Sequence, residues 1–147
     1  EVKFYDTVND ELLKFAVIIS QSNGKWVFCK HKERDTYEVP GGHREAGEDI
    51  LETAKRELQE ETGAIQFDIT SICIYSVTAP DNFDGMETFG KLFFSDIYTF
   101  EKELHSEIEK IAIMDELPIN WTYPEIQPKL LEEARKRGFC PKKDEIK

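Results

Sequence analysis

Three glutamates, Glu57, Glu60 and Glu61, lie in the last two turns of a helix that the sequence predicts over residues 50–62. The C-terminal end of a helix carries a partial negative charge, so each acidic side chain there costs about 0.3 kcal/mol or more. Glu57 and Glu61 are one turn apart and share a face, at the edge of the apolar stripe. Carboxylates gathered there are typical ligands of a hard divalent cation, because Mg²⁺ takes a few carboxylates together with water and phosphate oxygens. The three residues alone leave a solvated acidic helix end open as the alternative.

The segment around these glutamates has a fixed spacing of glycine and charged residues. Gly42 is followed six residues later by Glu48, and after seven further residues comes the run R-E-L-Q-E-E-T-G-A over residues 56–64. This spacing resembles the Nudix box, G-x5-E-x7-R-E-U-x-E-E-x-G-U, in which U is a bulky aliphatic residue. Ala64 departs from the pattern at the final U, which is an uncharged packing position. Residues 39–42, Val-Pro-Gly-Gly, resemble the segment that leads into the box. From Gly42 to Ala64 the chain is therefore similar to the MutT-like Nudix hydrolases.

The resemblance implies a metal site and a catalytic machinery. The metal ligands would be Glu57, Glu60, Glu61 and the carbonyl of Gly41, with Mg²⁺ as the cation and Mn²⁺ as a substitute. Gly42 would let the backbone approach the substrate closely, because glycine has no Cβ.

The resemblance also assigns catalytic roles to Glu60, Arg56 and Glu48. Glu60 would complete the metal cluster or orient the attacking water. Arg56 would pair with Glu48 and hold the neighbouring carboxylates in place. For Arg56 considered alone, a plain surface ion pair is the alternative.

Candidates outside the box have weaker support. Arg34, on the loop before Gly42, is placed to contact a substrate phosphate. A further acid is expected from Glu107, Glu109 or Glu87, with Glu107 the first choice. His43 is expected to pack in its loop. Four aromatic residues could stack on a base, although core or rim positions suit them better: Trp26, Tyr37, Phe83 and Phe89.

The elements that must position these residues form an α+β pattern. Strands are expected over residues 15–20, 25–29, 65–77, 89–100 and 107–114, from short apolar runs and period-two alternation. The helix over 50–62 has Asp49 and Glu52 as a capping box and Gly63 after its last turn, and a second helix is expected over 128–138. The resemblance implies an α/β/α sandwich with a mixed central sheet, which we expect to form one Nudix domain over residues 1–147.

Composition limits the partners. The chain of 147 residues has 19 Lys and Arg against 30 Asp and Glu, a net charge of −11. This charge argues against a nucleic-acid polymer or an anionic membrane as partner. Three well-separated cysteines form no disulfide pattern, and no apolar run reaches the length of a membrane span, so a cytoplasmic location is expected. A monomer and a homodimer both remain possible.

The resemblance fixes the expected reaction more closely than the substrate. We expect Mg²⁺-dependent cleavage of a pyrophosphate linkage in a nucleoside diphosphate derivative. A nucleoside triphosphate, including oxidised dGTP, is the first expectation, giving the monophosphate and pyrophosphate. ADP-ribose or another nucleoside diphosphate linked to a second group is the alternative. A Nudix-fold ligand sensor without turnover is an alternative of another class, although such proteins usually lose box carboxylates.

Overall fold

The computed structural model describes residues 1–79, 85–101 and 108–141. Its strands and helices, in chain order, are β1 (Val2–Tyr5), a short 3₁₀ turn (Asp10–Leu12), β2 (Leu13–Ser22), β3 (Lys25–His31), β4 (Gly41–His43), α1 (Ile50–Thr62), β5 (Ala64–Val77), β6 (Thr88–Phe100), β7 (Ile108–Met114) and α2 (Gln127–Lys136).

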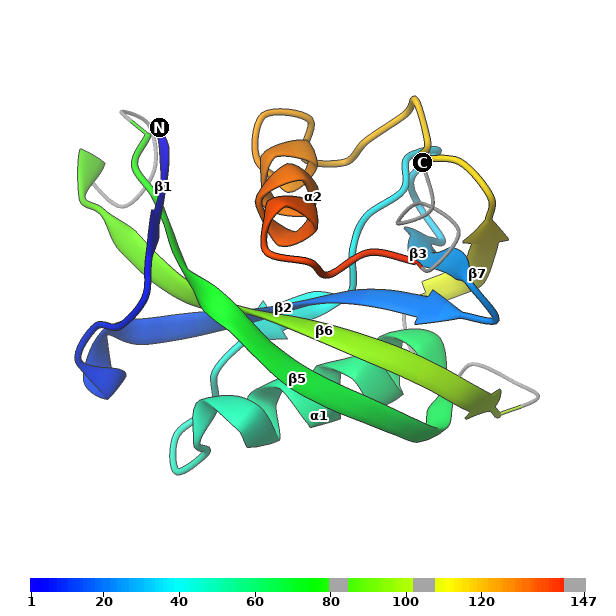
Figure 1. The fold of residues 1–147 in the computed structure, drawn as a ribbon, viewed down its shortest axis with the longest axis horizontal. Coiled ribbons are helices and arrows are strands. Elements are labelled where there is room, and N and C mark those ends of the chain that lie inside the picture. Colours follow the sequence, from blue (N-terminus) through cyan, green and yellow to red (C-terminus); the bar gives the residue numbers. More distant parts are fainter. Residues whose placement is uncertain (80–84, 102–107, 142–147) are drawn as a thin grey trace.

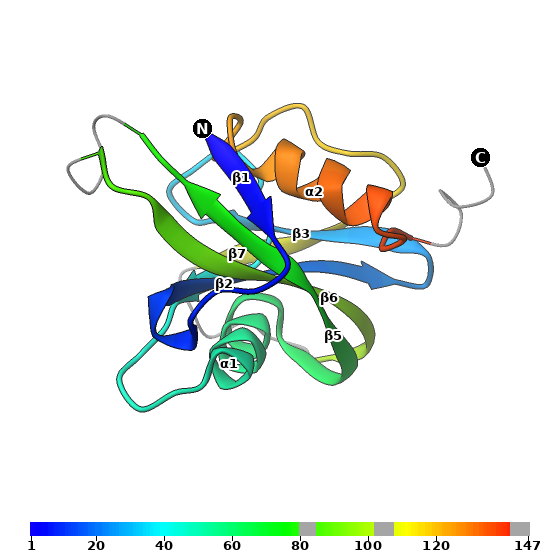
Figure 2. The same ribbon diagram turned by 60° about the vertical axis from the view of Figure 1, so that its left-hand side comes forward.

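These strands form one mixed sheet between two helices. The strand order is β1-β5-β6-β2-β3-β7, and β4 pairs with β2 beside this row. The pairing of β2 with β6 is parallel, and the other ladders are antiparallel. Helices α1 and α2 cover opposite faces of the sheet (Figures 1 and 2). The predicted α+β sandwich with a mixed central sheet is confirmed.

Each face of the sheet has its own apolar core. Ala54 and Leu58 of α1 are buried against one face, together with Ile18 and Phe93. The opposite core contains the buried face of α2, including Leu130, with residues that include Ile19, Phe28 and Leu92. Ile18 and Ile19, which are neighbours in β2, therefore pack into different cores. The burial of both faces of β2 explains why the run over residues 15–20, which predicted a strand, is apolar at successive positions.

Helix α1 begins and ends at the predicted signals. The side chain of Asp49 accepts a hydrogen bond from the Glu52 backbone N–H at 2.8 Å, and the Glu52 side chain accepts one from the Asp49 N–H at 3.2 Å. Gly63 follows the helix with a φ of 74°, a left-handed conformation that glycine adopts without steric cost. The last turns of α1, which carry the three glutamates, are thus fixed by local sequence.

Strand β5 changes face along its length. Its period-two pattern predicted the strand, but its apolar residues do not all point the same way. Phe67 and Ile69 pack on the α1 core, whereas Cys73 and Tyr75 are buried in the α2 core. A register shift in the pairing with β6 between Ser71 and Cys73 exchanges the two faces. This irregularity places the Tyr75 ring on the same side of the sheet as α2.

Candidate active site

The end of helix α1 is packed against the backbone of β4. Glu61 accepts a hydrogen bond through Oε1 from the Gly41 N–H at 2.7 Å. Burial raises the pKa of Glu61 to about 8, against the lowering effect of this hydrogen bond, and the nearby carboxylates of Glu57, Glu38 and Glu60 raise it further. Removal of the Gly41–Glu61 contact would therefore leave a buried carboxylate surrounded by other carboxylates.

Glu57 lies one turn earlier and touches the next residue of β4. A Cβ atom built on Gly42 would lie 1.9 Å from Oε2 of Glu57, so only glycine leaves room for this carboxylate. Burial raises the pKa of Glu57; Arg56 acts in the opposite direction, and Glu60 and Glu45 add to the rise. Each of the two glycines of β4 is thus in contact with one partly buried glutamate of α1: Gly41 with Glu61 and Gly42 with Glu57.

Arg56 connects the remaining acidic groups of the box. Its Nε donates to Oε2 of Glu48 at 2.7 Å and its Nη2 donates to Oε1 at 3.1 Å, a bidentate pair. Its Nη1 lies 3.5 Å from a carboxylate oxygen of each of three further residues: Glu45, Glu57 and Glu60. The hydrogen bond from Arg56 lowers the pKa of Glu48 to about 2, and the Glu45 backbone N–H and the Thr53 hydroxyl also lower it. Glu60 is the most exposed of the three helix glutamates, with 54% of its side chain accessible.

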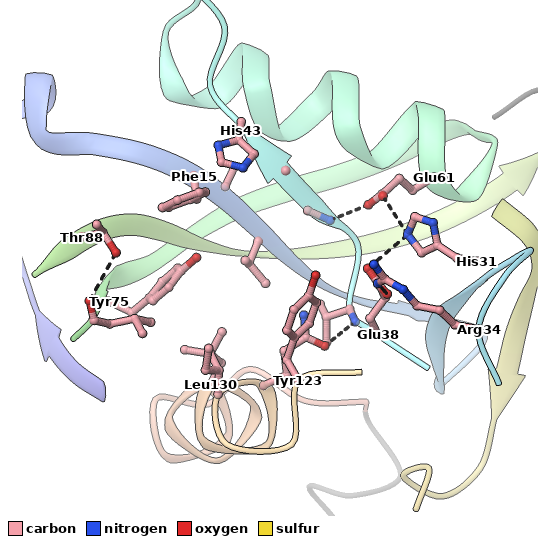
Figure 3. A pocket seen from close by; sticks show the side chains of 18 residues that line it. Phe15, His31, Arg34, Glu38, His43, Glu61, Tyr75, Thr88, Tyr123 and Leu130 are labelled. Carbon is pink, nitrogen blue, oxygen red and sulfur yellow. Dashed lines mark hydrogen bonds and ion pairs between the residues drawn. The ribbon is translucent and has the colours of Figure 1, made fainter. Parts of the chain in front are cut away.

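A second polar group reaches Glu61 from the other side. His31 ends β3, and its Nε2 lies 3.3 Å from Oε2 of Glu38 and 3.9 Å from Oε2 of Glu61. Arg34 donates from Nη1 to Oε1 of Glu38 at 3.2 Å. Figure 3 shows this group around Glu61 at one end of a pocket. Of these residues, His31 and Glu38 were missed by the sequence analysis.

The signal for Glu38 was present, because it directly precedes the Val-Pro-Gly-Gly segment. Its backbone bridges Cys29 of β3, and its side chain is only 9% exposed. A glutamate so deeply buried requires partners. His31 had no signal of its own, because a long-range backbone contact brings it to Glu38.

The pocket has one apolar part and one polar end. Its volume is about 360 Å³. Apolar and aromatic side chains from β2, β5 and α2 contribute to the wall, including Phe15, Tyr75 and Leu130 (Figure 3). Gly41, Gly42 and the group of His31, Arg34, Glu38 and Glu61 contribute its polar part. Four of the predicted residues thus line one cavity: Arg34, which is half exposed, Gly41, Gly42 and Glu61. The other predicted residues of the box are not among those that line it: Glu48, Arg56, Glu57 and Glu60.

The remaining candidates from the sequence are the possible further acids, His43 and Phe83. Glu87 accepts hydrogen bonds from the hydroxyls of Tyr5 at 2.5 Å and Ser76 at 2.6 Å, and these bonds lower its pKa. Glu107 and Phe83 lie outside the described residues, as does the side chain of Glu109. His43 lines the pocket and packs edge-on against Phe15, with the ring centroids 4.6 Å apart.

Three of the candidate stacking residues pack in or against the cores. Trp26 is buried in the core between the sheet and α2, and Tyr37 packs against that core. Phe89 packs against the core between the sheet and α1. The expectation of core or rim positions holds for these three. Within the described part of the chain, no helix is long and apolar enough to cross a membrane.

Comparisons with known proteins agree with this geometry. The family model of the NUDIX domain matches residues 11–136, which include the whole box, both helices and most of the sheet. The chain belongs to the Nudix hydrolase family. It is therefore a hydrolase that acts on phosphoanhydride bonds.

A relative and two solved structures illustrate the relationship. This Nudix hydrolase is 31% identical over 121 residues to the Bacillus subtilis protein YtkD, which carries the name "Putative 8-oxo-dGTP diphosphatase"; the match covers 82% of the chain and 73% of YtkD. The crystal structure of a mutant of the Bacillus subtilis pyrophosphohydrolase BsRppH is similar with a TM-score of 0.75 at 25% identity, over 93% of the chain and 91% of that protein. A NUDIX hydrolase from Nitrosomonas europaea shares the fold, with a TM-score of 0.64 at 20% identity over 88% of the chain and 93% of its own.

Proposed function

We propose that this Nudix hydrolase uses Mg²⁺, with Mn²⁺ as a substitute, to cleave a nucleoside triphosphate into the nucleoside monophosphate and pyrophosphate. The observation that carries the proposal is the pocket, which joins an apolar wall suited to a nucleoside to the backbone of Gly41 and Gly42 and the carboxylate of Glu61. A triphosphate whose nucleoside lies on the apolar wall would extend its phosphates toward this polar end.

The donor set at the end of α1 fits a hard divalent cation. Glu57 and Glu61 are partly buried carboxylates with raised pKa values, and a cation is the partner that would offset their mutual repulsion. Glu57, Glu60, Glu61 and the Gly41 carbonyl would hold it. When bound, Mg²⁺ supplies charge neutralisation at the phosphates and lowers the pKa of a coordinated water. A protein with a net charge of −11 needs such positive charge to receive an anionic substrate.

The chain's own residues would then position the reacting groups. The Glu48–Arg56 pair fixes the guanidinium from which Nη1 faces Glu45, Glu57 and Glu60, so it holds these carboxylates at defined positions. Glu60 is exposed enough to orient the attacking water. Arg34 lies beside the pocket and would contact a substrate phosphate, while Gly42 lets the phosphate chain approach the backbone.

The name of YtkD suggests an oxidised purine nucleotide as a specific substrate to test. We include 8-oxo-dGTP among the proposed triphosphates. The apolar wall and the aromatic side chains of Phe15 and Tyr75 are compatible with a purine base.

The test is a substrate panel measured with millimolar Mg²⁺. The panel contains the common nucleoside triphosphates, 8-oxo-dGTP, ADP-ribose and dinucleoside polyphosphates, and products are separated by ion-exchange chromatography. We expect a triphosphate to give its monophosphate and pyrophosphate, with no product after addition of EDTA and full recovery with Mg²⁺ or Mn²⁺. Turnover of ADP-ribose alone would contradict the triphosphate assignment, and binding without any product would favour the sensor.

A further inference from the structure

Beside the box lies a group of three possible metal ligands from three different segments. His31 comes from the end of β3, Glu38 from the loop that leads to β4, and Glu61 from the last turn of α1. One ligand atom of each residue lies within 4.8 Å of the ligand atoms of the other two. Figure 3 shows the His31 imidazole between the two carboxylates.

The distances suit a small divalent ion. Bonds of about 2.1 Å to a tetrahedral ion place neighbouring ligand atoms about 3.4 Å apart. His31 Nε2 and Glu38 Oε2 are 3.3 Å apart, and His31 Nε2 and Glu61 Oε2 are 3.9 Å apart. A shift of about half an ångström in the Glu61 side chain would bring its Oε2 to this distance from His31 Nε2. The ligand atoms of Glu38 and Glu61 lie within 4.8 Å of each other.

The two carboxylates are already oriented toward His31. Oε1 of Glu38 accepts a hydrogen bond from Arg34, and Oε1 of Glu61 accepts one from the Gly41 N–H. In each carboxylate this leaves Oε2 as the oxygen that faces the imidazole. Hydrogen bonds to the outer atoms of metal ligands are the usual means by which proteins hold such ligands in position.

The ligand types differ from those of the box. The box offers only oxygens, which suit Mg²⁺, whereas this group adds an imidazole nitrogen. One nitrogen with two carboxylate oxygens favours a transition-metal ion over Mg²⁺. The burial of Glu38 and Glu61 limits competition from water.

We propose that His31, Glu38 and Glu61 form a binding site for a divalent transition-metal ion, with Zn²⁺ as the best match. Open coordination positions would face the pocket, which these three residues help to line. The site would share Glu61 with the carboxylates of the Nudix box, and its occupation does not depend on which nucleotide is hydrolysed.

The test is calorimetric titration of the metal-free protein with Zn²⁺ in a buffer that contains millimolar Mg²⁺. We expect Zn²⁺ binding that weakens by about 100-fold in His31→Gln and by at least about 10-fold in Glu38→Gln. The matched control is His43→Gln, which should bind as the parent protein does. Thermal unfolding of each metal-free variant shows whether it is folded.

A crystal soaked in Zn²⁺ gives the second measurement, independent of activity. Anomalous scattering should place the ion within bonding distance of His31 Nε2 and of an oxygen of Glu38 and of Glu61. Unchanged Zn²⁺ affinity in folded His31→Gln and Glu38→Gln, or an ion found only elsewhere, would overturn the proposal. Both readouts are of binding, so they stand apart from the hydrolysis assays that test the proposed function.

Discussion

The carboxylate of Glu57 lies directly against the backbone of Gly42. A Cβ atom at Gly42 would be 1.9 Å from Oε2 and 2.3 Å from Cδ of Glu57, distances at which something must move. The atoms that would be displaced belong to the end of a flexible side chain. Glycine is therefore required at position 42 because it leaves room for the Glu57 carboxylate, more than because the backbone of β4 needs it.

Gly42→Ala should consequently impair hydrolysis and spare the fold. We expect kcat/KM to fall by about 100-fold, because a displacement of about 1 Å in a group that positions the reaction has effects of this size. Thermal unfolding should show a folded protein.

Gly41→Ala is the contrasting variant, because its Cβ would lie 2.5 Å from the backbone oxygen of Ala16, which cannot rotate away as a side chain can. That variant should lose stability. If Gly42→Ala hydrolysed the substrate with the kcat/KM of the parent protein, the position of the Glu57 carboxylate against Gly42 would not matter for hydrolysis.

Glu57→Gln keeps the shape of the side chain and removes its charge. We expect kcat to fall by at least about 100-fold, since a bound cation contributes several kcal/mol to the stabilisation of the transition state and Glu57 is one of the residues proposed to hold it. The metal-free protein should stay as stable or become slightly more stable, because burial disfavours the charged Glu57 and Arg56 offsets this only in part. Steady-state kinetics and urea unfolding measure the two effects.

The control for Glu57→Gln is Glu132→Gln, an exposed glutamate of α2 paired with Lys136 at 3.8 Å. It removes the same charge far from the box and should change neither quantity measurably. An unchanged kcat in Glu57→Gln would remove Glu57 from the metal site.

The parts of the site that local sequence specifies could be predicted. The capping box, the helical spacing of the glutamates and Gly63 lie within one short segment, so the contact of Arg56 with Glu48 and Glu60 follows from the helix and the loop before it. The face change of β5 could not be predicted, because a register shift against β6 produces it. The approach of His31 to Glu61 depends on the docking of β3 and α1, and no pattern in either segment encodes it.

Glu48 should make the protein sensitive to acid. Its pKa is lowered from 4.5 to about 2 in the folded protein, first by the hydrogen bond from Arg56. A lowered native pKa contributes stability that is present above pH 4.5 and is lost as the pH falls toward 2. Urea unfolding across this range should show a smaller loss of stability in Glu48→Gln than in the parent protein. Glu125→Gln, at an exposed position, is the control and should follow the parent curve. Equal slopes for the parent and Glu48→Gln would contradict the Arg56–Glu48 pair in solution.

Glu61 should have the opposite effect in the metal-free protein. Its pKa is raised to about 8 by burial, so the folded state binds a proton that the unfolded state releases near pH 4.5. The stability linked to this proton is complete below pH 4.5 and is lost as the pH rises through 8. In EDTA, the thermal unfolding temperature of the parent protein should decrease as the pH rises across this range. The unfolding temperature of Glu61→Gln should decrease less. At the high end of this pH range, saturating Mg²⁺ should restore the stability of the parent protein, by about 2.7 kcal/mol when the free Mg²⁺ concentration is 100 times its Kd. The parent protein and Glu61→Gln should differ least in unfolding temperature at low pH, where Glu61 is neutral. If the two plots of unfolding temperature against pH ran parallel in EDTA, Glu61 would not be a carboxylate buried among other carboxylates.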